Sequence, residues 1–205
     1  MMEDGKLSLD LLMGLSIFLF TFIFVANFLP GVFADVRNEI SLANQAYRIS
    51  ALLVEDPGYN STWFMDINPD NCRGEEYRPG LASYVNDTTT VFNKLEIGKI
   101  EKLAELLSIP DCRERVKFLL GLNLSEMGGQ TFKFNVSLRN LSGELITKDG
   151  NVLLNHGDIL PNHGDIIYPG QIVKFERIVY LSQMVDNCHI IAERCVAKLE
   201  VVVWI

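Results

Sequence analysis

The chain has 205 residues, and its 18 Lys and Arg residues against 26 Asp and Glu residues give a net charge of −8. This length accommodates one or two domains with a hydrophobic core of their own. The negative charge, and the lack of a Lys/Arg cluster interleaved with aromatic residues, argue against nucleic acid as a partner. Hydrophobic residues make up 48% of the chain, and their excess lies mainly at the N-terminal end.

The N-terminal segment contains a long uncharged run, Leu11–Leu29, which as a helix of 19 residues covers about 28 Å. This is close to the thickness of a bilayer's hydrocarbon core. A secretory signal has a basic head and an apolar core of about 7–15 residues, whereas this run is longer and follows a net acidic head. We therefore expect a retained membrane span. Cleavage by signal peptidase after Ala34 is the alternative.

Residues 35–58 continue the helical pattern, because no turn signal occurs before Asp56-Pro57-Gly58. Apolar residues recur there every three or four positions, which predicts one buried stripe of Val36, Ile40, Ala43, Tyr47, Ala51 and Val54. The sequence thus predicts one helix over 9–55, apolar in its first half and amphipathic in its second. We expect a kink at Pro30-Gly31.

The segment Gly-Lys-Leu-Ser-Leu-Asp-Leu-Leu, residues 5–12, resembles the processing site of type IV pilin-like proteins, in particular the class III signal peptides of archaeal pilins and archaellins. In that family a prepilin-type peptidase cuts after a small residue and before the hydrophobic run, and an acidic residue stands fifth after the cut. Gly5 and Asp10 match these positions, so the resemblance implies processing between Gly5 and Lys6. Glu3 and Asp4 stand where the family usually has basic residues.

The resemblance also implies a role for Asp10 in subunit docking. A carboxylate beside a purely apolar stretch is costly in lipid unless it is paired. In a filament the new α-amino group on Lys6 of a neighbouring subunit supplies that partner. The implied organisation is a processed leader over 1–5, a membrane-spanning and amphipathic helix over 6–56, and an extracytoplasmic head over 57–205.

The first part of this head, 57–128, is predicted to consist of loops and two short helices. Residues 57–93 are rich in turn signals, with a short strand at 81–85. One helix is expected at about 94–107, and a second begins near Pro110, since proline suits a first helical turn. The core face of the first helix is Ile97, Ile100, Leu103, Ala104 and Leu107.

The second part, 129–205, is predicted to be an antiparallel sheet. Polar and apolar residues alternate in strand fashion over 131–140, 171–184 and 189–205, and Lys148-Asp149-Gly150-Asn151 has the composition of a hairpin turn. The last strand is strongly apolar and must be paired or covered to avoid aggregation at an exposed edge. The expected fold is therefore α+β, with the long N-terminal helix packed on the sheet.

The four cysteines are an even number, which suits a two-disulfide framework outside the cytoplasm. Three pairings are possible in principle. We favour Cys188–Cys195, because the C-x6-C spacing can link the ends of a hairpin turn, and Cys72–Cys112 by elimination. Buried free thiols are the alternative. Five N-x-[ST] sequons are candidate glycosylation sites in an exported domain: Asn60, Asn86, Asn123, Asn135 and Asn140.

An Asn-His-Gly-Asp-Ile repeat occurs at 155–159 and 162–166. Its imidazoles and carboxylates, His156, Asp158, His163 and Asp165, are possible metal ligands. However, the odd offset of seven residues puts the copies on opposite faces of an extended chain, and Pro161 forbids helix. We therefore expect two tandem turns and no metal.

No sequence motif of a hydrolase, kinase, zinc protease or dinucleotide-binding enzyme occurs. We therefore expect no enzymatic activity, no catalytic residue and no cofactor. The favoured function is a pilin-like structural subunit, minor or accessory, of a cell-surface filament or its assembly machinery. Its partners would be the membrane, other pilin-like subunits and a prepilin-type peptidase. The alternatives are a single-pass membrane protein with a binding or sensing head outside the cell, and a tethered metal-dependent hydrolase using the repeat.

Overall fold

The computed structural model describes residues 4–59, 62–72, 76–85, 89–123, 131–159 and 171–205, with backbone alone at 4–10, 34–39, 85 and 89. The chain forms two compact units, Met1–Ser41 and Leu42–Ile205. We call the second the C-terminal unit. Helix α1 (Asp4–Glu55) contributes residues to both units, and its last turns belong to the C-terminal unit. The unit therefore begins earlier than the boundary at 56/57 expected from sequence.

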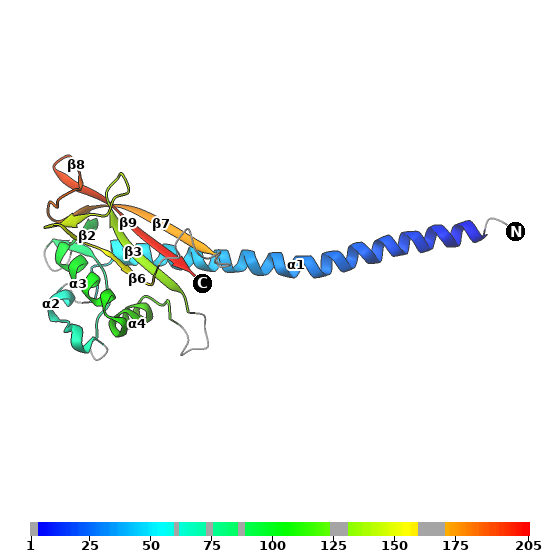
Figure 1. The fold of residues 1–205 in the computed structure, drawn as a ribbon, viewed down its shortest axis with the longest axis horizontal. Helices are drawn as coiled ribbons and strands as arrows, with labels where there is room; N and C mark the ends of the chain where they lie inside the picture. Colours follow the sequence, from blue (N-terminus) through cyan, green and yellow to red (C-terminus); the bar gives the residue numbers. More distant parts are fainter. Residues whose placement is uncertain (1–3, 60–61, 73–75, 86–88, 124–130, 160–170) are drawn as a thin grey trace. The chain divides into compact units, whose positions relative to one another are not determined.

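The C-terminal unit combines short helices with a sheet, which confirms the predicted α+β class (Figure 1). Its helices are α2 (Trp63–Asp66), the 3-10 helix η1 (Pro69–Asn71), α3 (Ile97–Ser108) and α4 (Pro110–Leu119). Its strands are β1 (Ala82–Val85), β2 (Thr89–Leu95), β3 (Lys133–Arg139), β4 (Thr147–Lys148), β5 (Asn151–Val152), β6 (Asn155–Gly157), β7 (Ile172–Leu181), β8 (His189–Ile191) and β9 (Arg194–Trp204).

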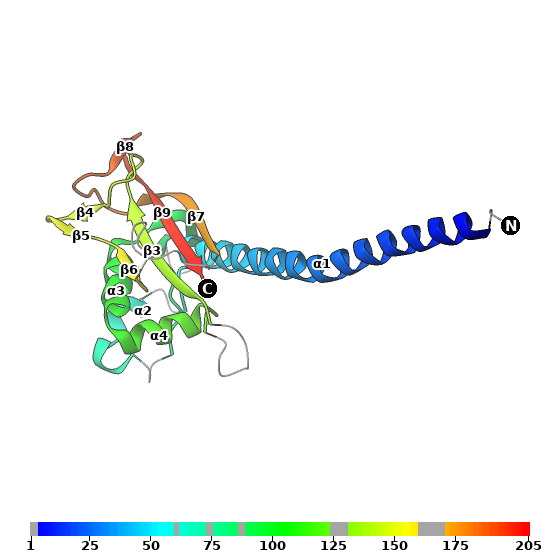
Figure 2. The same ribbon diagram turned by 45° about the vertical axis from the view of Figure 1, so that its right-hand side comes forward.

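The sheet is mixed, whereas the sequence predicted an antiparallel one. Its order is β1-β2-β7-β9-β3-β6, with β8 paired to β9. Figure 2 shows β9 between β7 and β3. The pairs are antiparallel except β2–β7, which is parallel, with Leu95 opposite Leu181. Parallel neighbours need a long crossover, and the chain between β2 and β7 provides one that contains α3 and α4.

Strand β9 lies at the centre of the sheet. It pairs with β7 on one side and with β3 on the other, so Val201 has Phe175 and Val136 as its two neighbours. The side chains of Val201 and Val203 are fully buried. The apolar C-terminal strand is therefore paired on both sides, and the edge exposure considered from sequence does not arise.

The segment 189–205 is a hairpin, not the single strand predicted. Ala192 and Glu193 have φ angles of 49° and 62°. Two successive residues with positive φ form the type I′ turn that matches the twist of paired strands. Strand β8 consequently folds back on the first residues of β9.

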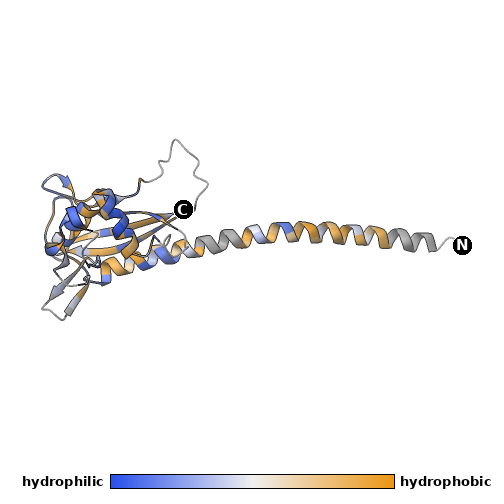
Figure 3. Cartoon of the chain, turned by 90° about the horizontal axis from the view of Figure 1, so that it is seen from below, coloured by the Kyte–Doolittle hydropathy of each residue, from blue (hydrophilic) through white to orange (hydrophobic). Residues whose placement is uncertain are grey.

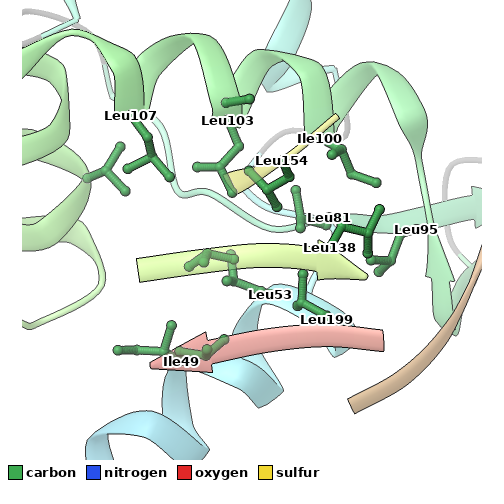
Figure 4. Close-up of a cluster of buried hydrophobic side chains, with 14 of the residues drawn as sticks. Ile49, Leu53, Leu81, Leu95, Ile100, Leu103, Leu107, Leu138, Leu154 and Leu199 are labelled. Atoms are coloured by element: carbon green, nitrogen blue, oxygen red, sulfur yellow. The ribbon is translucent and has the colours of Figure 1, made fainter. Parts of the chain in front are cut away.

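The last turns of α1 pack on the sheet with a stripe that matches the predicted one only at Val54, which is fully buried. The other buried apolar residues are Leu42, Ala46, Ile49 and Leu53, whereas Ile40 of the predicted stripe is 56% exposed. The helix carries two adjacent apolar stripes, and Ile49 and Leu53 belong to the one that enters the core (Figure 4). Tyr47 remains 54% exposed, and its ring meets the edge of Phe175 at 5.6 Å between centroids.

Helices α3 and α4 agree with the sequence in their core face and in the start of α4 at Pro110. The predicted residues of α3 are buried, and Ile100, Leu103 and Leu107 join the cluster that holds Leu138 and Leu199 of the sheet (Figure 4). However, α3 begins at Ile97 and not near 94, because Thr89–Leu95 forms strand β2. The sequence missed this strand among the surrounding turn signals.

The connection after α1 is fixed by Trp63. Its ring stacks on Tyr77 at 6.0 Å between centroids, and its Nε1 donates to the carbonyl oxygen of Gly80 at 3.0 Å. A Cβ on Gly80 would overlap the carbonyl of Asp56, so only glycine allows the two backbone segments to approach this closely. The loop is thereby attached to the edge of the sheet next to β1.

Candidate functional site

The strongest functional feature is the apolar part of α1. Leu11–Phe33 is a run of 23 residues, and at 1.5 Å per residue it measures about 35 Å. Its side chains are exposed throughout. In the hydropathy colouring of the ribbon, this part of α1 is mostly apolar, with a few polar positions between (Figure 3). This helix is long and apolar enough to cross a membrane, as the sequence predicted.

The predicted processing and docking residues lie in the first turns of α1. Gly5, Lys6 and Asp10 have helical backbone, and their side chains lie outside the described part of the structure. The processing and docking roles therefore stay predictions. The helix continues through Pro30 and Gly31, where the sequence predicted a kink.

Both predicted disulfides are present, and all four cysteines take part in them. Cys72 follows η1 and bonds to Cys112 of α4, with 5.6 Å between their Cα atoms. Cys188 and Cys195 link the two sides of the β8–β9 hairpin, with 5.5 Å between Cα atoms. The alternative of buried free thiols is thereby excluded.

Two of the predicted glycosylation sites are buried. Asn135 lies inside β3 and is 7% exposed. Asn140 is also 7% exposed, and its Nδ2 donates to Glu144 Oε2 and to the carbonyl oxygen of Asn187. An N-linked glycan is attached to the Nδ2 atom of asparagine and needs that atom exposed and free. Neither Asn135 nor Asn140 is therefore accessible for glycosylation in the folded chain. Asn123 is partly exposed, and Asn60 and Asn86 lie outside the described residues.

The first copy of the Asn-His-Gly-Asp repeat forms strand β6, so the prediction of a turn is wrong there. Its His156 stands opposite Val136 of β3. Burial, with a contribution from the charge of Arg113, lowers the pKa of His156. His163 and Asp165 of the second copy lie outside the described residues. Within the described residues, no group of three His, Cys, Asp or Glu side chains is placed to hold a metal ion.

Asp158, which follows β6, links α4 to the sheet. Its carboxylate accepts from the buried Lys117 Nζ at 2.8 Å and from the backbone N–H of Phe134 at 3.1 Å. Lys117 also bonds to Glu114 Oε1 at 2.9 Å. The Lys117 ammonium thus has two carboxylate partners, and the Asp158 carboxylate has both an ammonium and a backbone N–H as donors. Because both charged groups are paired, they can be accommodated where α4 packs on the sheet.

Lys99 is a buried cation that sequence reasoning missed. Its Nζ donates to the carbonyl oxygens of Pro57 and Ala82 at 2.7 and 2.8 Å, and it lies over the ring of Tyr84. Burial lowers the pKa of Lys99 to about 8, although the charges of Glu96 and Asp56 oppose this. Its burial could have been suspected from the sequence, because Lys99 stands beside Ile100 on the apolar face of the predicted helix.

The face of the sheet that lies away from the last turns of α1 carries a series of ion pairs. Lys174 bonds to Glu176 at 2.8 Å and to Glu200 at 3.1 Å, and Arg139 lies 3.4 Å from Glu200. The hydrogen bond between Lys174 and Glu176 raises the pKa of Lys174 and lowers the pKa of Glu176. The Lys174–Glu200 pair links β7 to β9, and the Arg139–Glu200 pair links β3 to β9, so these cross-strand charge pairs contribute to the pairing of the three strands.

A shallow pocket of about 380 Å³ lies where β2, β7 and the β8–β9 hairpin meet. Its polar lining includes Lys94, Glu193 and Arg194, and its apolar lining includes Met184 and the ring of Tyr180. The guanidinium of Arg194 stacks over Tyr180 at 5.0 Å. Ser182 also lines the pocket, and its hydroxyl donates to Glu96 Oε1 at 3.2 Å. This arrangement can accept a small polar ligand.

Comparison with known proteins gives one relevant similarity. A protein of Archaeoglobus fulgidus, described as an uncharacterized protein, is 50% identical to this chain over 208 residues, which cover 99% of each. No family model and no solved structure matches the chain. Similarity at this level over the full length means a shared fold and a shared origin. The chain therefore belongs to the same family as this archaeal protein.

Proposed function

We propose that this protein is a pilin-like structural subunit, minor or accessory, of a cell-surface filament or of its assembly machinery. Its N-terminal helix anchors it in the membrane, and residues 57–205 lie outside the cell. The observation that carries the proposal is the continuity of α1. One uninterrupted helix, Asp4–Glu55, contains a membrane-length apolar run and then an amphipathic stretch that enters the core of a sheet-containing unit.

A simple membrane anchor does not need this continuity. In α1 the polypeptide passes from the apolar run into the turns that bury Leu42, Ile49 and Leu53. A subunit that inserts its first half among the helices of its neighbours, and supports a head on its second half, uses both parts. The resemblance of residues 5–12 to class III signal peptides points to the same architecture, and the archaeal relative comes from the domain of life in which those peptides occur.

Disulfides persist in oxidising compartments and also inside the cells of hyperthermophilic archaea, so the two bonds are compatible with an extracytoplasmic position for the C-terminal unit, and that position rests on the resemblance of residues 5–12. In this orientation Lys6 becomes the first residue of the mature chain after cleavage by a prepilin-type peptidase. The carboxylate of Asp10 then pairs with the α-amino group of Lys6 on a neighbouring subunit. That ion pair sets the axial register of the two helices.

Intact-mass analysis of the protein extracted from membranes of an archaeal host that contains the peptidase tests the proposal. A mature chain that begins at Lys6 supports it. A chain that begins at Met1 or at Asp35 contradicts it, since the first is an uncut anchor and the second has lost the apolar run.

Two variants separate processing from docking. Gly5→Val places a branched side chain before the cut and should leave the chain beginning at Met1. Asp10→Asn should leave the cut unchanged and reduce recovery of the protein in assembled fractions. If both variants are cut and assembled like the wild type, neither residue has the role that the proposal gives it.

The pocket beside β7 favours a second candidate, a membrane-tethered binding or sensing domain. Its volume of about 380 Å³ suits a small ligand, and Lys94 and Arg194 would favour an anionic one. This candidate predicts a stable monomer whose N-terminus is uncut. Binding of small carboxylates to the detergent-solubilised full chain, compared with Arg194→Met, tests it by isothermal titration.

A further inference from the structure

We propose that α1 associates with a second copy of itself through Asn27, which lies within the apolar run. The inference rests on the proposed function only in requiring that the mature chain keeps α1 in a membrane. It identifies a contact that neither the processing site nor Asp10 provides.

Asn27 is an exposed amide in the middle of apolar neighbours such as Phe24 and Phe28. It lies six residues before the end of the run at Phe33, which places it about 9 Å inside that end. Its Nδ2 donates one hydrogen to the carbonyl oxygen of Ile23 at 2.8 Å. Among the described residues, its second amide hydrogen and its side-chain oxygen have no partner. In hydrocarbon no water supplies one.

Pro30 removes one backbone donor from the same part of the helix. Proline has no backbone N–H, so the carbonyl of Ala26 lacks the donor that the fourth residue after it normally supplies. Asn27 and this carbonyl are neighbours in the chain. The helix therefore presents two acceptors and one donor within one turn, at a depth where each unpaired polar group is unfavourable.

Gly31 makes this surface accessible to another helix. It follows Asn27 by four residues and so lies on nearly the same face, about 40° away. A Cβ placed on Gly31 meets nothing within 4 Å among the described residues, so the backbone is open there. Small residues at such a position let two helix backbones approach closely in a membrane.

The occupant that fits these groups is a second copy of the same helix. A carboxamide contains both a donor and an acceptor, so it is complementary to itself, and two Asn27 side chains in a parallel pair satisfy each other. The carbonyl of Ala26 accepts any remaining amide hydrogen. The proposed filament places many parallel copies of α1 side by side, whereas a monomeric anchor leaves these groups unpaired.

Sedimentation equilibrium of the full chain in density-matched detergent micelles tests the inference. Asn27→Leu keeps the size of the side chain and removes its hydrogen bonds. Thr21→Val is the matched control, because the Thr21 hydroxyl already donates to the carbonyls of Ile17 and Phe18 and lies about 120° from Asn27. Asn27→Gln keeps the amide and should retain association.

We expect the wild-type chain to self-associate, and Asn27→Leu to weaken that association by about 3- to 30-fold, the range for one interhelical side-chain hydrogen bond in a membrane protein. Thr21→Val should change it less than twofold. A wild-type chain that is monomeric at every ratio of protein to detergent overturns the inference. So does an Asn27→Leu variant that associates as well as Thr21→Val.

The mass of the same preparations distinguishes the two proposals. A chain that begins at Lys6 with no effect of Asn27→Leu keeps the proposed function and removes this contact. A chain that begins at Met1 with a clear effect of Asn27→Leu keeps the contact and contradicts the pilin-like processing. A chain that begins at Asp35 has lost Asn27 and overturns both.

Discussion

Burial of the Lys99 ammonium makes the stability of the fold depend on pH in a way that can be measured. The side chain is 2% exposed, and its pKa is lowered from the ordinary value of 10.5 to about 8. The folded chain therefore releases this proton at a lower pH than the unfolded chain does. Between about pH 8 and 10.5 the unfolded state holds more protons, so the free energy of unfolding rises with pH.

The magnitude follows from the difference between the two pKa values. Each tenfold change in proton affinity corresponds to about 1.4 kcal/mol, so the full rise from Lys99 is about 3 kcal/mol. Below pH 8 both states carry the charge, and the unfavourable burial of the ammonium is fully present. Above pH 10.5 both states are neutral, and that contribution is gone.

Comparison of the wild type with Lys99→Met isolates this contribution, because other titrating groups act on both chains. The variant leaves the carbonyls of Pro57 and Ala82 without their donor, which lowers stability by an amount that does not depend on pH. The difference in unfolding free energy should therefore grow by about 3 kcal/mol from pH 7.5 to 10.5 in favour of the wild type.

Denaturant unfolding of the full chain in detergent, followed by near-ultraviolet circular dichroism, provides the assay. Lys148→Met is the control, since hydrogen bonding to Glu101 raises the pKa of Lys148 and no such growth is expected in this window. If the difference between wild type and Lys99→Met stays within about 0.5 kcal/mol over the whole pH range, the reasoning about burial is refuted.

Three further predictions concern stability, each measured by unfolding of the full chain in detergent. Replacing Cys72 and Cys112 together by Ser opens a loop closed across 40 residues and should cost about 4 kcal/mol, and an unchanged midpoint would contradict this. Lys117→Met leaves the partly buried carboxylate of Asp158 without its ammonium partner and should lower the free energy of unfolding by about 2–3 kcal/mol. Leu53→Ala should cost about 3 kcal/mol and Ile40→Ala less than 0.5; the reverse order would mean that the stripe predicted from sequence is the buried one.

The sequence determined those features that depend on neighbours along the chain. The apolar run that begins at Leu11, the core face of α3 and the start of α4 at Pro110 follow from composition, from helical periodicity and from proline's fixed φ. The run was predicted to end at Leu29, and the structure extends it to Phe33. The pairing of Cys188 with Cys195 followed from a spacing that suits a hairpin. These patterns are local, so they can be recognised without knowledge of what packs against them.

The tertiary structure decided what distant segments do to one another. The sheet meets the side of α1 that carries Leu42, Ala46, Ile49 and Leu53, and of the predicted stripe only Val54 is buried with them, although either stripe fits the helical period. β9 lies at the centre because β3 and β7 both pair with it. Likewise, a lysine on a helix becomes a buried cation only when two backbone carbonyls from elsewhere close over it, as Pro57 and Ala82 do over Lys99.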